Sequence, residues 1–383
     1  MMASQAENDF LVRIQAFAKT ELTPAAAGWS MGQSPDAAMY SKSGGLGLTG
    51  IQVPRDLGGQ DLGFAVKAQV CGILAYADFG FAMSLINSHN VAARLCRSAV
   101  PTLRDRYLPS LLSGQTSACT ALTEPSTGSD FAAIRTKALS DGDNWVLSGE
   151  KRWIVNGRHA GLAIVFAKCG DVDDASGIAA FLVDLTAPGV RRYAIESGFS
   201  QTSIGTGGFV LDAVELPGAN LLLPAGTAFK SILTEINGAR TYVAAMCNGM
   251  LRAALDQATV YGTVRHSFGK PLNAHPGWQA ALERAGEALT ASEDCTAKAI
   301  QLIDSAQDAQ LAAAQAKIKA VESCQHHLPE LMHAMGAEGL LPNYPFTRHL
   351  AATQMAALAD GATNILRERV ARLTRTADEK TKD

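Results

Sequence analysis

A run of small polar residues at positions 121–130, Ala-Leu-Thr-Glu-Pro-Ser-Thr-Gly-Ser-Asp, has the residue types that a ligand-binding loop needs. It follows an expected helical segment at 106–113 and precedes a series of expected strands. Its small side chains leave backbone N–H groups and hydroxyls open, so such a loop can lie flat against a planar heterocycle or a thioester. An ordinary polar turn fixed by Pro125 explains the same residues, and the loop alone does not decide between the two.

Four segments of the chain together carry a resemblance. They are Leu-Thr-Glu-Pro-x-x-Gly-Ser-Asp at 122–130, Ser-Gly-Glu-Lys-Arg-Trp-Ile-Val-Asn-Gly at 148–157, Arg-His-Ser-Phe-Gly-Lys-Pro-Leu at 265–272, and Tyr344-Pro345 followed by Asp360-Gly361. In this order they resemble the acyl-CoA dehydrogenase family. The resemblance covers nearly the whole chain.

The resemblance implies a fold and a reaction. The implied fold is α+β, with an N-terminal helical domain, a small middle β-domain and a C-terminal four-helix bundle. The implied reaction is FAD-dependent α,β-desaturation of an acyl thioester, in which a base removes the α-proton and the β-hydride passes to flavin N5. The thioester is carried by CoA or by an acyl-carrier protein. The resemblance also implies a homotetramer or homodimer that shares FAD between subunits, with an electron-transfer flavoprotein as one candidate acceptor.

Several residues are expected to contact FAD by this resemblance. Thr123 is expected to bond the isoalloxazine and Trp153 to pack on its ring, whereas a tryptophan in the core of a β-domain is the alternative for Trp153. Arg265 is expected to contact the FAD diphosphate of a neighbouring subunit, for which the charged fork of arginine is suited. A solvated cation at a helix end is the alternative for Arg265. The full expected set is Leu122, Thr123, Ser129, Trp153, Val155, Arg265, Ser267, Phe268, Gln279, His333, Gly336, Ala362 and Asn364.

The expected catalytic base is Asp360, which occupies the position of the family's glutamate within Leu-Ala-Asp-Gly-Ala. The family's other base position precedes an arginine and is Ala239 here, before Arg240. Aspartate is one methylene shorter than glutamate, and a base must come within hydrogen-bond reach of its proton. A helix-terminal acid with no catalytic part is the alternative. The amide N–H of Asp360 is expected to polarise the thioester carbonyl, and the expected substrate contacts are Ser129, Arg240, Asp360 and Gly361.

Departures from the family pattern keep other functions open. Val155 lacks the hydroxyl expected near flavin N5, Pro276 and His333 each replace a glutamine, Ala362 replaces a threonine, and the segment 201–204 lacks its arginine. Three alternatives remain beside the CoA-linked dehydrogenase. They are a biosynthetic dehydrogenase that uses an acyl-carrier protein, a thioester lyase in which FAD is redox-silent, and a cofactor-poor non-catalytic homologue.

The composition is that of an ordinary globular protein. The chain has 383 residues, 47% of them hydrophobic and 18% charged, and a net charge of −3, which argues against binding driven by nucleic-acid phosphates. No secretory signal or membrane span is visible, and the scattered cysteines form no C-x-x-C pair, so a cytoplasmic location with free thiols is expected. His326, His327 and His333 lack ligand spacing to one another, so no metal site is expected.

The periodicity of apolar residues predicts the elements that hold these residues. Helices broken by glycine-rich turns are expected up to residue 112. Short strands are expected at 134–139, 145–148, 153–155, 162–167, 178–185 and 209–216, and four long helices at 226–264, 277–304, 307–335 and 348–372. The expected domains are 1–118, 119–222 and 223–383.

Overall fold

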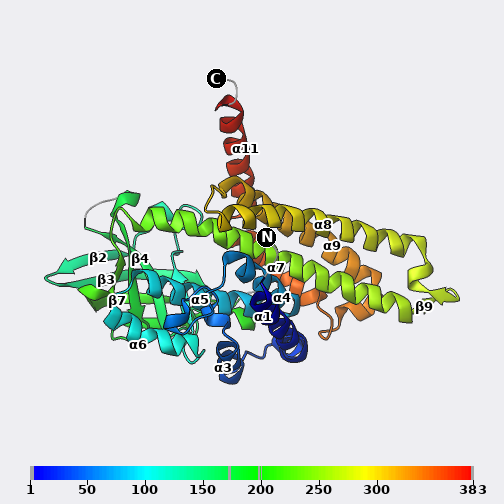
Figure 1. Cartoon of the computed structure of the whole chain (residues 1–383), viewed down its shortest axis with the longest axis horizontal. Coiled ribbons are helices and arrows are strands. Elements are labelled where there is room, and N and C mark those ends of the chain that lie inside the picture. Colours follow the sequence, from blue (N-terminus) through cyan, green and yellow to red (C-terminus); the bar gives the residue numbers. More distant parts are fainter. Residues whose placement is uncertain (1–3, 171–173, 197–198, 200, 381–383) are drawn as a thin grey trace. The chain divides into compact units, whose positions relative to one another are not determined.

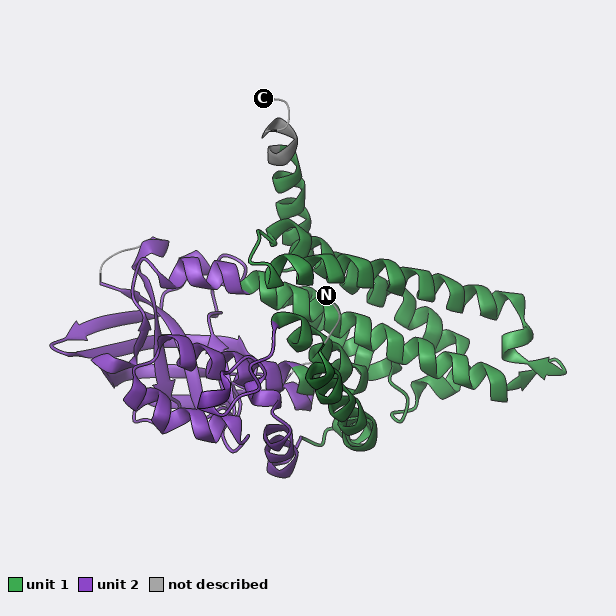
Figure 2. Ribbon diagram, in the orientation of Figure 1, with its two compact units in different colours: residues 1–34, 64–82, 236–383 green, residues 35–63, 83–235 purple. Residues whose placement is uncertain are grey.

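The computed structural model describes residues 4–170, 174–196, 199 and 201–380. The chain divides into two compact units (Figure 2). Unit 1 comprises residues 1–34, 64–82 and 236–383, and unit 2 comprises residues 35–63 and 83–235.

Unit 2 is built on an eight-stranded sheet (Figure 1). Its strand order is β6-β7-β3-β2-β4-β5-β8, and β1 pairs with β4 in addition. The β1–β4 and β2–β4 pairs are parallel, and the other pairs are antiparallel. The strands are β1 (Ala118–Ala121), β2 (Lys137–Asp141), β3 (Asn144–Ile154), β4 (Leu162–Cys169), β5 (Ile178–Asp184), β6 (Val190–Ala194), β7 (Gly207–Pro217) and β8 (Leu221–Leu223).

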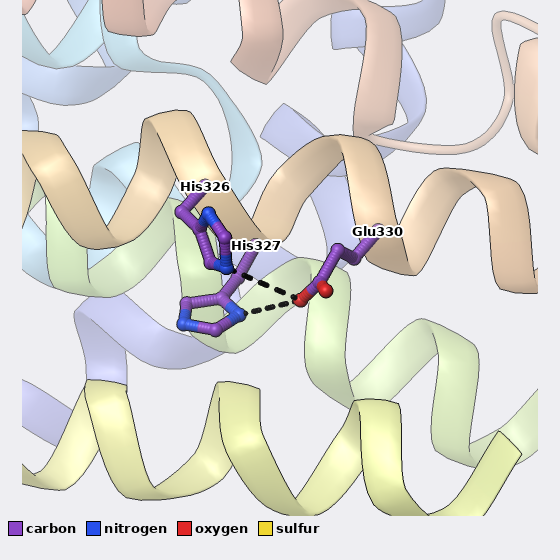
Figure 3. Close-up of side chains that lie close together, drawn as sticks. All are labelled: His326, His327 and Glu330. Atoms are coloured by element: carbon purple, nitrogen blue, oxygen red, sulfur yellow. Dashed lines mark hydrogen bonds and ion pairs between the residues drawn. The ribbon is translucent and has the colours of Figure 1, made fainter. Parts of the chain in front are cut away.

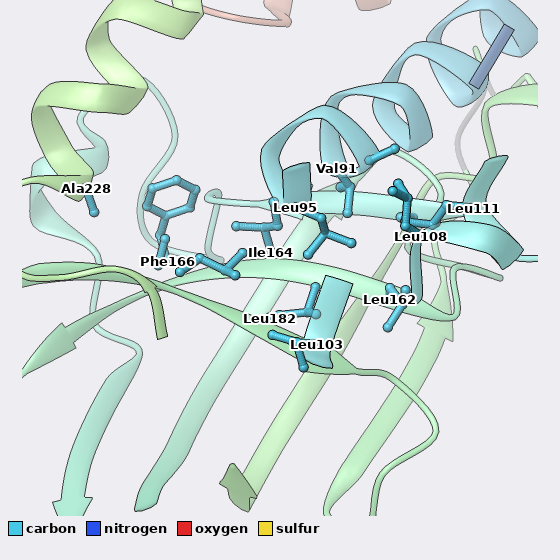
Figure 4. Close-up of a cluster of buried hydrophobic side chains, with 14 of the residues drawn as sticks. Val91, Leu95, Leu103, Leu108, Leu111, Leu162, Ile164, Phe166, Leu182 and Ala228 are labelled. Atoms are coloured by element: carbon cyan, nitrogen blue, oxygen red, sulfur yellow. The ribbon is translucent and has the colours of Figure 1, made fainter. Parts of the chain in front are cut away.

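The central strands β4 and β5 are buried on both faces, which explains their unbroken apolar sequences. Even-numbered residues of β4 from Leu162 to Phe166 belong to one hydrophobic core, and odd-numbered residues from Ala163 to Ala167 belong to another. The first core is closed by α5 (Phe79–Ser98) and α6 (Pro101–Leu112), whose leucines lie over the sheet (Figure 4). This unit also contains α3 (Ala37–Gly45).

The second core of unit 2 is enclosed by the sheet itself. It joins residues of β4 and β5 to residues of β3 and β7, such as Leu147 and Phe209. Strands that are not neighbours in the sheet therefore meet across this core, so the sheet curves over its own apolar face. A curved sheet of this kind needs local irregularities, and β3 supplies them with register shifts between Leu147 and Gly149 and between Lys151 and Ile154.

Unit 1 is a helical assembly. Its long antiparallel helices α8 and α9 pack against each other, and α10 and α11 pack on α9. The interior face of α9 is rich in alanine, including Ala313, Ala316 and Ala320, which lets the helices approach closely. The helices that lie wholly or mostly in this unit are α1 (Gln5–Phe17), a π-helical turn (Ala18–Leu22), α2 (Thr23–Ser30), α4 (Phe64–Ala77), α7 (Ala228–Val264), α8 (Pro276–Asp304), α9 (Gln310–Ala334), α10 (Phe346–Leu358) and α11 (Thr363–Lys380). A short hairpin of β9 (His266–Ser267) and β10 (Lys270–Pro271) joins α7 to α8.

The architecture expected from the sequence is confirmed, with helical segments before and after a β-rich middle part. Three details differ. The two strands expected at 145–148 and 153–155 are parts of the single bulged strand β3. Strands β1, β6 and β8 and the short strands β9 and β10 were not expected. The helix expected over 348–372 is wrong as one element, because the backbone turns out of the helix between Leu358 and Thr363 and forms α10 and α11.

Within the described residues, no helix combines the length and the apolar character needed to cross a membrane.

Burial in the first core of unit 2 predicts a large difference between two leucines of the sheet. Leu182 of β5 is fully buried, whereas Leu139 of β2 is 53% exposed. Leu182→Ala is expected to lower the free energy of unfolding by about 2 to 5 kcal/mol through lost burial and a residual cavity. Leu139→Ala is the control and is expected to change it by less than about 0.5 kcal/mol. Urea denaturation measures both, and equal effects would contradict the placement of Leu182 in the core.

Candidate active site

The loop at 122–136 in unit 2 is held by the carboxylate of Glu124. This carboxylate accepts hydrogen bonds from Arg135 N at 2.6 Å, Thr136 N at 2.9 Å and Thr136 Oγ1 at 2.6 Å. It also forms an ion pair with Lys151 Nζ at 2.8 Å, and the same ammonium donates to Leu122 O at 3.2 Å. The loop is thereby fixed to β3, which carries Lys151.

The ion pair between Glu124 and Lys151 lies in the interior of unit 2. The side chain of Lys151 is fully buried and that of Glu124 is 4% exposed. Burial lowers the pKa of Lys151 to about 8, although the Glu124 carboxylate opposes this. Burial also opposes ionisation of Glu124, but the charge and hydrogen bond of Lys151, together with the bonds from Thr136 and Arg135, outweigh it and lower the pKa of Glu124.

The loop and β3 present several of the expected site residues on one part of unit 2. Arg152 N donates to Thr123 O at 3.0 Å, which places Thr123 beside the backbone that leads into Trp153. The Trp153 side chain is 54% exposed and its φ is 60°, within the bulge of β3 opposite Gly208. The interpretation of Trp153 as a core residue is therefore wrong. Ser129 is exposed, and Leu122 and Val155 are half-buried.

The position of Asp360 in unit 1 is set by the break between α10 and α11. Asp360 has φ 53° and Gly361 has φ 105°, so the chain leaves α10 through two successive left-handed residues. Arg240 of α7 donates from Nε to Asp360 O at 3.0 Å and from a terminal nitrogen to Asn237 Oδ1 at 3.1 Å. Arg240 is 5% exposed, and Asp360 is half-buried. Arg240, Asp360 and Gly361, which the sequence indicated as substrate contacts, thus lie together.

Lys317 of α9 completes this cluster, and no motif in the sequence pointed to it. Its side-chain nitrogen donates to Ala359 O and, at 2.5 Å, to Gly361 O, and the residue is fully buried. A lysine in a helix is usually exposed to solvent. The apolar residues on both sides of Lys317 were the one indication in the sequence that this lysine is buried. Ala239, the family's other base position, lies beside Arg240 and has no titratable group.

The charges around Asp360 act in opposite directions on its ionisation. Burial raises the pKa of Asp360, while the cations of Lys317 and Arg240 oppose that shift. Burial lowers the pKa of Lys317 to about 8, against the attraction of the Asp360 carboxylate. Burial likewise lowers the pKa of Arg240 to about 10, with the charge of Arg369 acting in the same direction. The cluster thus holds a carboxylate of raised basicity among two cations.

A second set of expected residues gathers around the β9–β10 hairpin of unit 1 (Figure 1). His275 of the following turn bonds Ser267 O at 3.1 Å, and Trp278 Nε1 donates to Ala334 O at 3.2 Å, which joins the first turn of α8 to the last turn of α9. Phe268 at the tip is 96% exposed with φ 50°. The expected residues of this hairpin cluster are Arg265, Ser267, Phe268, Gln279, His333 and Gly336, and all but Ser267 are exposed.

The two sets of residues in unit 1 lie far apart along α7. Arg240 and Val264, which precedes Arg265, are 24 residues apart in one continuous helix, or about 36 Å at the α-helical rise. The remaining expected contacts, Ala362 and Asn364, lie at the start of α11 beside Asp360. The structure therefore does not bring all expected residues of unit 1 into one group. The Asp360 cluster and the hairpin cluster are separate.

The histidines of α9 form an ion-pair group with an acid that the sequence analysis did not consider (Figure 3). His327 Nδ1 lies 2.8 Å and His326 Nε2 lies 4.0 Å from Glu330 Oε2, and the ligand atoms of the three residues lie within 4.8 Å of one another. The other oxygen of Glu330 lies 3.4 Å from Arg284. Glu330 is thus already in contact with Arg284 and with both imidazoles, and His333 is not part of the group.

The Glu124–Lys151 pair predicts a strong effect of removing one partner. Lys151→Met is expected to lower the free energy of unfolding by about 3 to 5 kcal/mol, because it leaves the buried Glu124 carboxylate without its counter-charge. The double variant with Glu124→Gln is expected to recover part of that loss. Lys137→Met, at an exposed position of β2, is the control. Chemical denaturation at pH 7 measures all four proteins.

The lowered pKa of Glu124 also predicts a dependence on pH. A carboxylate with a pKa below the ordinary value of 4.5 contributes stability above pH 4.5 and loses it as the pH falls through its folded value. The stability advantage of the wild-type protein over Glu124→Gln is therefore expected to shrink in acid. An advantage that stays constant from pH 7 to pH 3 would contradict this account of the pair.

Comparisons with known proteins agree with the fold and with the sequence motifs. The models of three acyl-CoA dehydrogenase domains match this chain: the N-terminal domain over residues 4–115, the middle domain over 119–214 and the C-terminal domain over 226–374. The mitochondrial short-chain specific acyl-CoA dehydrogenase of Bos taurus is 31% identical over 353 residues, which cover 92% of this chain and 85% of the relative.

Solved structures of similar proteins cover the chain almost completely. A glutaryl-CoA dehydrogenase from Mycobacterium smegmatis in complex with FADH2 is 25% identical with a TM-score of 0.90, and the match covers 97% of this chain and 95% of the other. Butyryl-CoA dehydrogenase from Megasphaera elsdenii, 24% identical with a TM-score of 0.91 and coverage of 98% and 99%, has the same fold. On these matches and on the motifs in its sequence, this chain belongs to the acyl-CoA dehydrogenase family of flavin-dependent oxidoreductases that act on CH–CH bonds.

Proposed function

We propose that this protein catalyses the FAD-dependent α,β-desaturation of an acyl-CoA thioester, with the Asp360 carboxylate as the base. The observation that carries this proposal is the Asp360 cluster. It places a carboxylate of raised pKa at a left-handed turn, beside two buried cations whose charges oppose the effect of burial. A carboxylate of raised pKa is a stronger base than an ordinary one and is suited to remove a weakly acidic α-proton.

The backbone at Asp360 supports the same reaction. Among the described residues, the amide N–H of Asp360 has no hydrogen-bond acceptor, while its carbonyl is held by Arg240. A free donor next to the base can bond the thioester carbonyl and stabilise the negative charge that develops there as the α-proton leaves. The shorter side chain of aspartate requires the substrate to lie closer to the backbone than a glutamate would, and this same N–H can hold it there.

The residues expected at the flavin fit a planar ring system. Trp153 is a large exposed aromatic held at a bulge by the fixed backbone of β3, and Thr123 lies beside that backbone. Thr127 Oγ1 of the same loop is buried and has no hydrogen-bond partner in the described part of the chain, so this hydroxyl can form a hydrogen bond with a ligand. When bound, FAD supplies the acceptor for the β-hydride. Thr123, Trp153 and Val155 would orient it.

The separation within unit 1 supports an oligomer. The hairpin cluster with Arg265 lies about 36 Å along α7 from Arg240, which is too far for both clusters of one chain to bind the same small ligand. We propose that Arg265, Ser267 and Phe268 contact the cofactor of a neighbouring subunit, as the sequence indicated. The exposed Phe268 at the hairpin tip, 96% exposed in the single chain, fits a residue that another subunit covers.

The experiment that tests this function is an anaerobic titration of the purified protein with acyl-CoA thioesters, followed by the visible absorbance of the flavin. The panel begins with short chains, because the Bos taurus relative is described as short-chain specific. Bleaching by one thioester supports the proposal and identifies the substrate class. Bleaching only by acyl-carrier-protein thioesters changes the carrier, and a bound flavin that no thioester reduces favours lyase chemistry. A protein that does not bind FAD even after reconstitution overturns the proposal.

Asp360→Asn is expected to abolish flavin reduction by the substrate, since the amide cannot accept the α-proton. Asp294→Asn, at an exposed position of α8, is the matched control and is expected to leave reduction unchanged. Rapid-mixing absorbance measures the rate of reduction in both variants. Reduction by Asp360→Asn at the wild-type rate would assign the base to another group.

The raised pKa of Asp360 predicts where the reaction loses activity in acid. The carboxylate form is the active one, so the reduction rate is expected to fall as the pH falls through the folded pKa of Asp360. Because burial raises that pKa, the fall is expected above the ordinary aspartate value of 3.8. A reduction rate that is constant from pH 8 down to pH 4 would contradict this prediction.

A further inference from the structure

Three consecutive backbone carbonyls at the break between α10 and α11 accept hydrogen bonds from two buried cations. Lys317 Nζ binds the carbonyl oxygens of Ala359 and Gly361, and Arg240 Nε binds the carbonyl oxygen of Asp360 between them at 3.0 Å. The two cations come from different helices, α9 and α7. The backbone on both sides of the proposed base is therefore held from the interior of unit 1.

The geometry of the peptide bond turns this arrangement into an orientation of the amides. In a trans peptide the C=O and the following N–H point in opposite directions. Because the carbonyl of Ala359 faces Lys317, the N–H of Asp360 faces away from it, and the N–H of Ala362 does the same because the carbonyl of Gly361 faces Lys317. The left-handed φ of 53° at Asp360 is unfavourable for a residue with a side chain, and the bonds from the cations stabilise it.

The charge of Lys317 acts on the same residue. The groups that face Lys317 are Asp360 in the loop and Arg240 and Cys247 on α7, and Arg369 of α11 acts on Arg240. Among these, the carboxylate of Asp360 is the anion that favours the protonated form of Lys317. In return, the ammonium lowers the pKa of Asp360 against the effect of burial. Lys317 thus supplies both hydrogen bonds and a positive field at the base.

We propose that Lys317 is a positioning residue for proton abstraction: its charged side chain holds the carbonyls on either side of Asp360 so that the Asp360 amide faces the thioester, and its positive charge favours the carboxylate form of Asp360. This inference depends on the proposed role of Asp360. Lys317 itself is fully buried and does not touch the substrate.

The alternative to this proposal is a purely structural connection between α9 and the loop. The two differ in whether the charge matters. Lys317→Gln retains two N–H donors but has no charge, whereas Lys317→Arg retains a charge. Lys319 lies on the same helix at an exposed position, so Lys319→Gln is the matched control. If Lys317 is only a structural connection, the activity lost in each variant is expected to follow its loss of thermal stability, and the pH dependence of proton abstraction is expected to stay unchanged.

The test uses the holoenzyme and a reaction that needs no oxidation. The probe is the 3-thia analogue of the acyl-CoA that reduces the flavin, in which sulfur replaces the β-carbon, so no β-hydride can leave. Exchange of its α-protons for deuterium in D2O, measured by mass spectrometry from pH 5 to pH 9.5, reports the base step alone. If no acyl-CoA reduces the flavin and no thioester exchanges its α-protons in the wild-type protein, the proposed function fails, and this result is distinct from any outcome for Lys317.

In the wild-type protein, the exchange rate is expected to fall above about pH 8, where Lys317 loses its proton. In Lys317→Gln, exchange at pH 7 is expected to fall at least tenfold, since a small misplacement of a reacting group costs up to about a hundredfold. The fall of the exchange rate in acid, the acidic limb of the pH profile, is expected to occur about one pH unit or more higher in this variant, because a positive charge next to the Asp360 carboxylate has been removed. Lys319→Gln is expected to match the wild-type profile.

Lys317→Arg separates charge from stability and carries the test if Lys317→Gln does not fold. It is expected to keep the acidic limb of the wild-type protein and to lose the fall near pH 8, because a guanidinium stays charged throughout the range. An unchanged acidic limb in Lys317→Gln overturns the proposal. A wild-type profile that stays flat to pH 9.5 overturns it as well, and that measurement requires no variant.

Discussion

Two fully buried lysines, one in each unit, hold the loops that carry the proposed chemistry. Lys151 donates to Leu122 O and pairs with Glu124, and Lys317 donates to the carbonyls of Ala359 and Gly361. A buried ammonium is unfavourable without hydrogen-bond acceptors, so the burial of each lysine favours a loop that brings carbonyl or carboxylate oxygens to the nitrogen. The cost of burying the charge therefore favours the observed conformation of each loop over conformations that would leave the lysine without these acceptors.

Both loops combine this internal restraint with an irregular backbone. Trp153 lies within a bulge of β3, and Asp360 follows the end of α10, and both residues have positive φ values, 60° and 53°. In a regular strand, the alternation of side chains would fix which face of the sheet Trp153 lies on. In a regular helix, the Asp360 N–H would be used in an intrahelical hydrogen bond. The irregularities free an aromatic ring in one unit and an amide donor in the other, while the lysines keep both positions defined.

The sequence predicted the parts of the fold that depend on local pattern. The short apolar runs at 162–167 and 178–185 predicted strands, and they correspond to β4 and β5. The break after Leu358 was missed because helix-favouring alanines lie on both sides of it, and Gly361 was the main sign of a stop. The motif match found Asp360 and Arg240, which are close neighbours in unit 1. It did not find Lys317, because burial of one lysine depends on helices that are distant in the sequence. The expected flavin contacts and the domain boundaries remain predictions.

The length of α7 has a consequence for how an oligomer responds to damage. One chain carries Arg240, beside the base, and Arg265, at the hairpin, about 36 Å apart along one rigid helix. Under the proposed function these belong to two different sites, so each chain contributes halves of two sites and completes none. Two chains that are inactive for different reasons, one without Asp360 and one without Arg265, can then restore each other. In a mixed pair, one site loses both residues, and the other receives an intact Asp360 from one chain and an intact Arg265 from its partner.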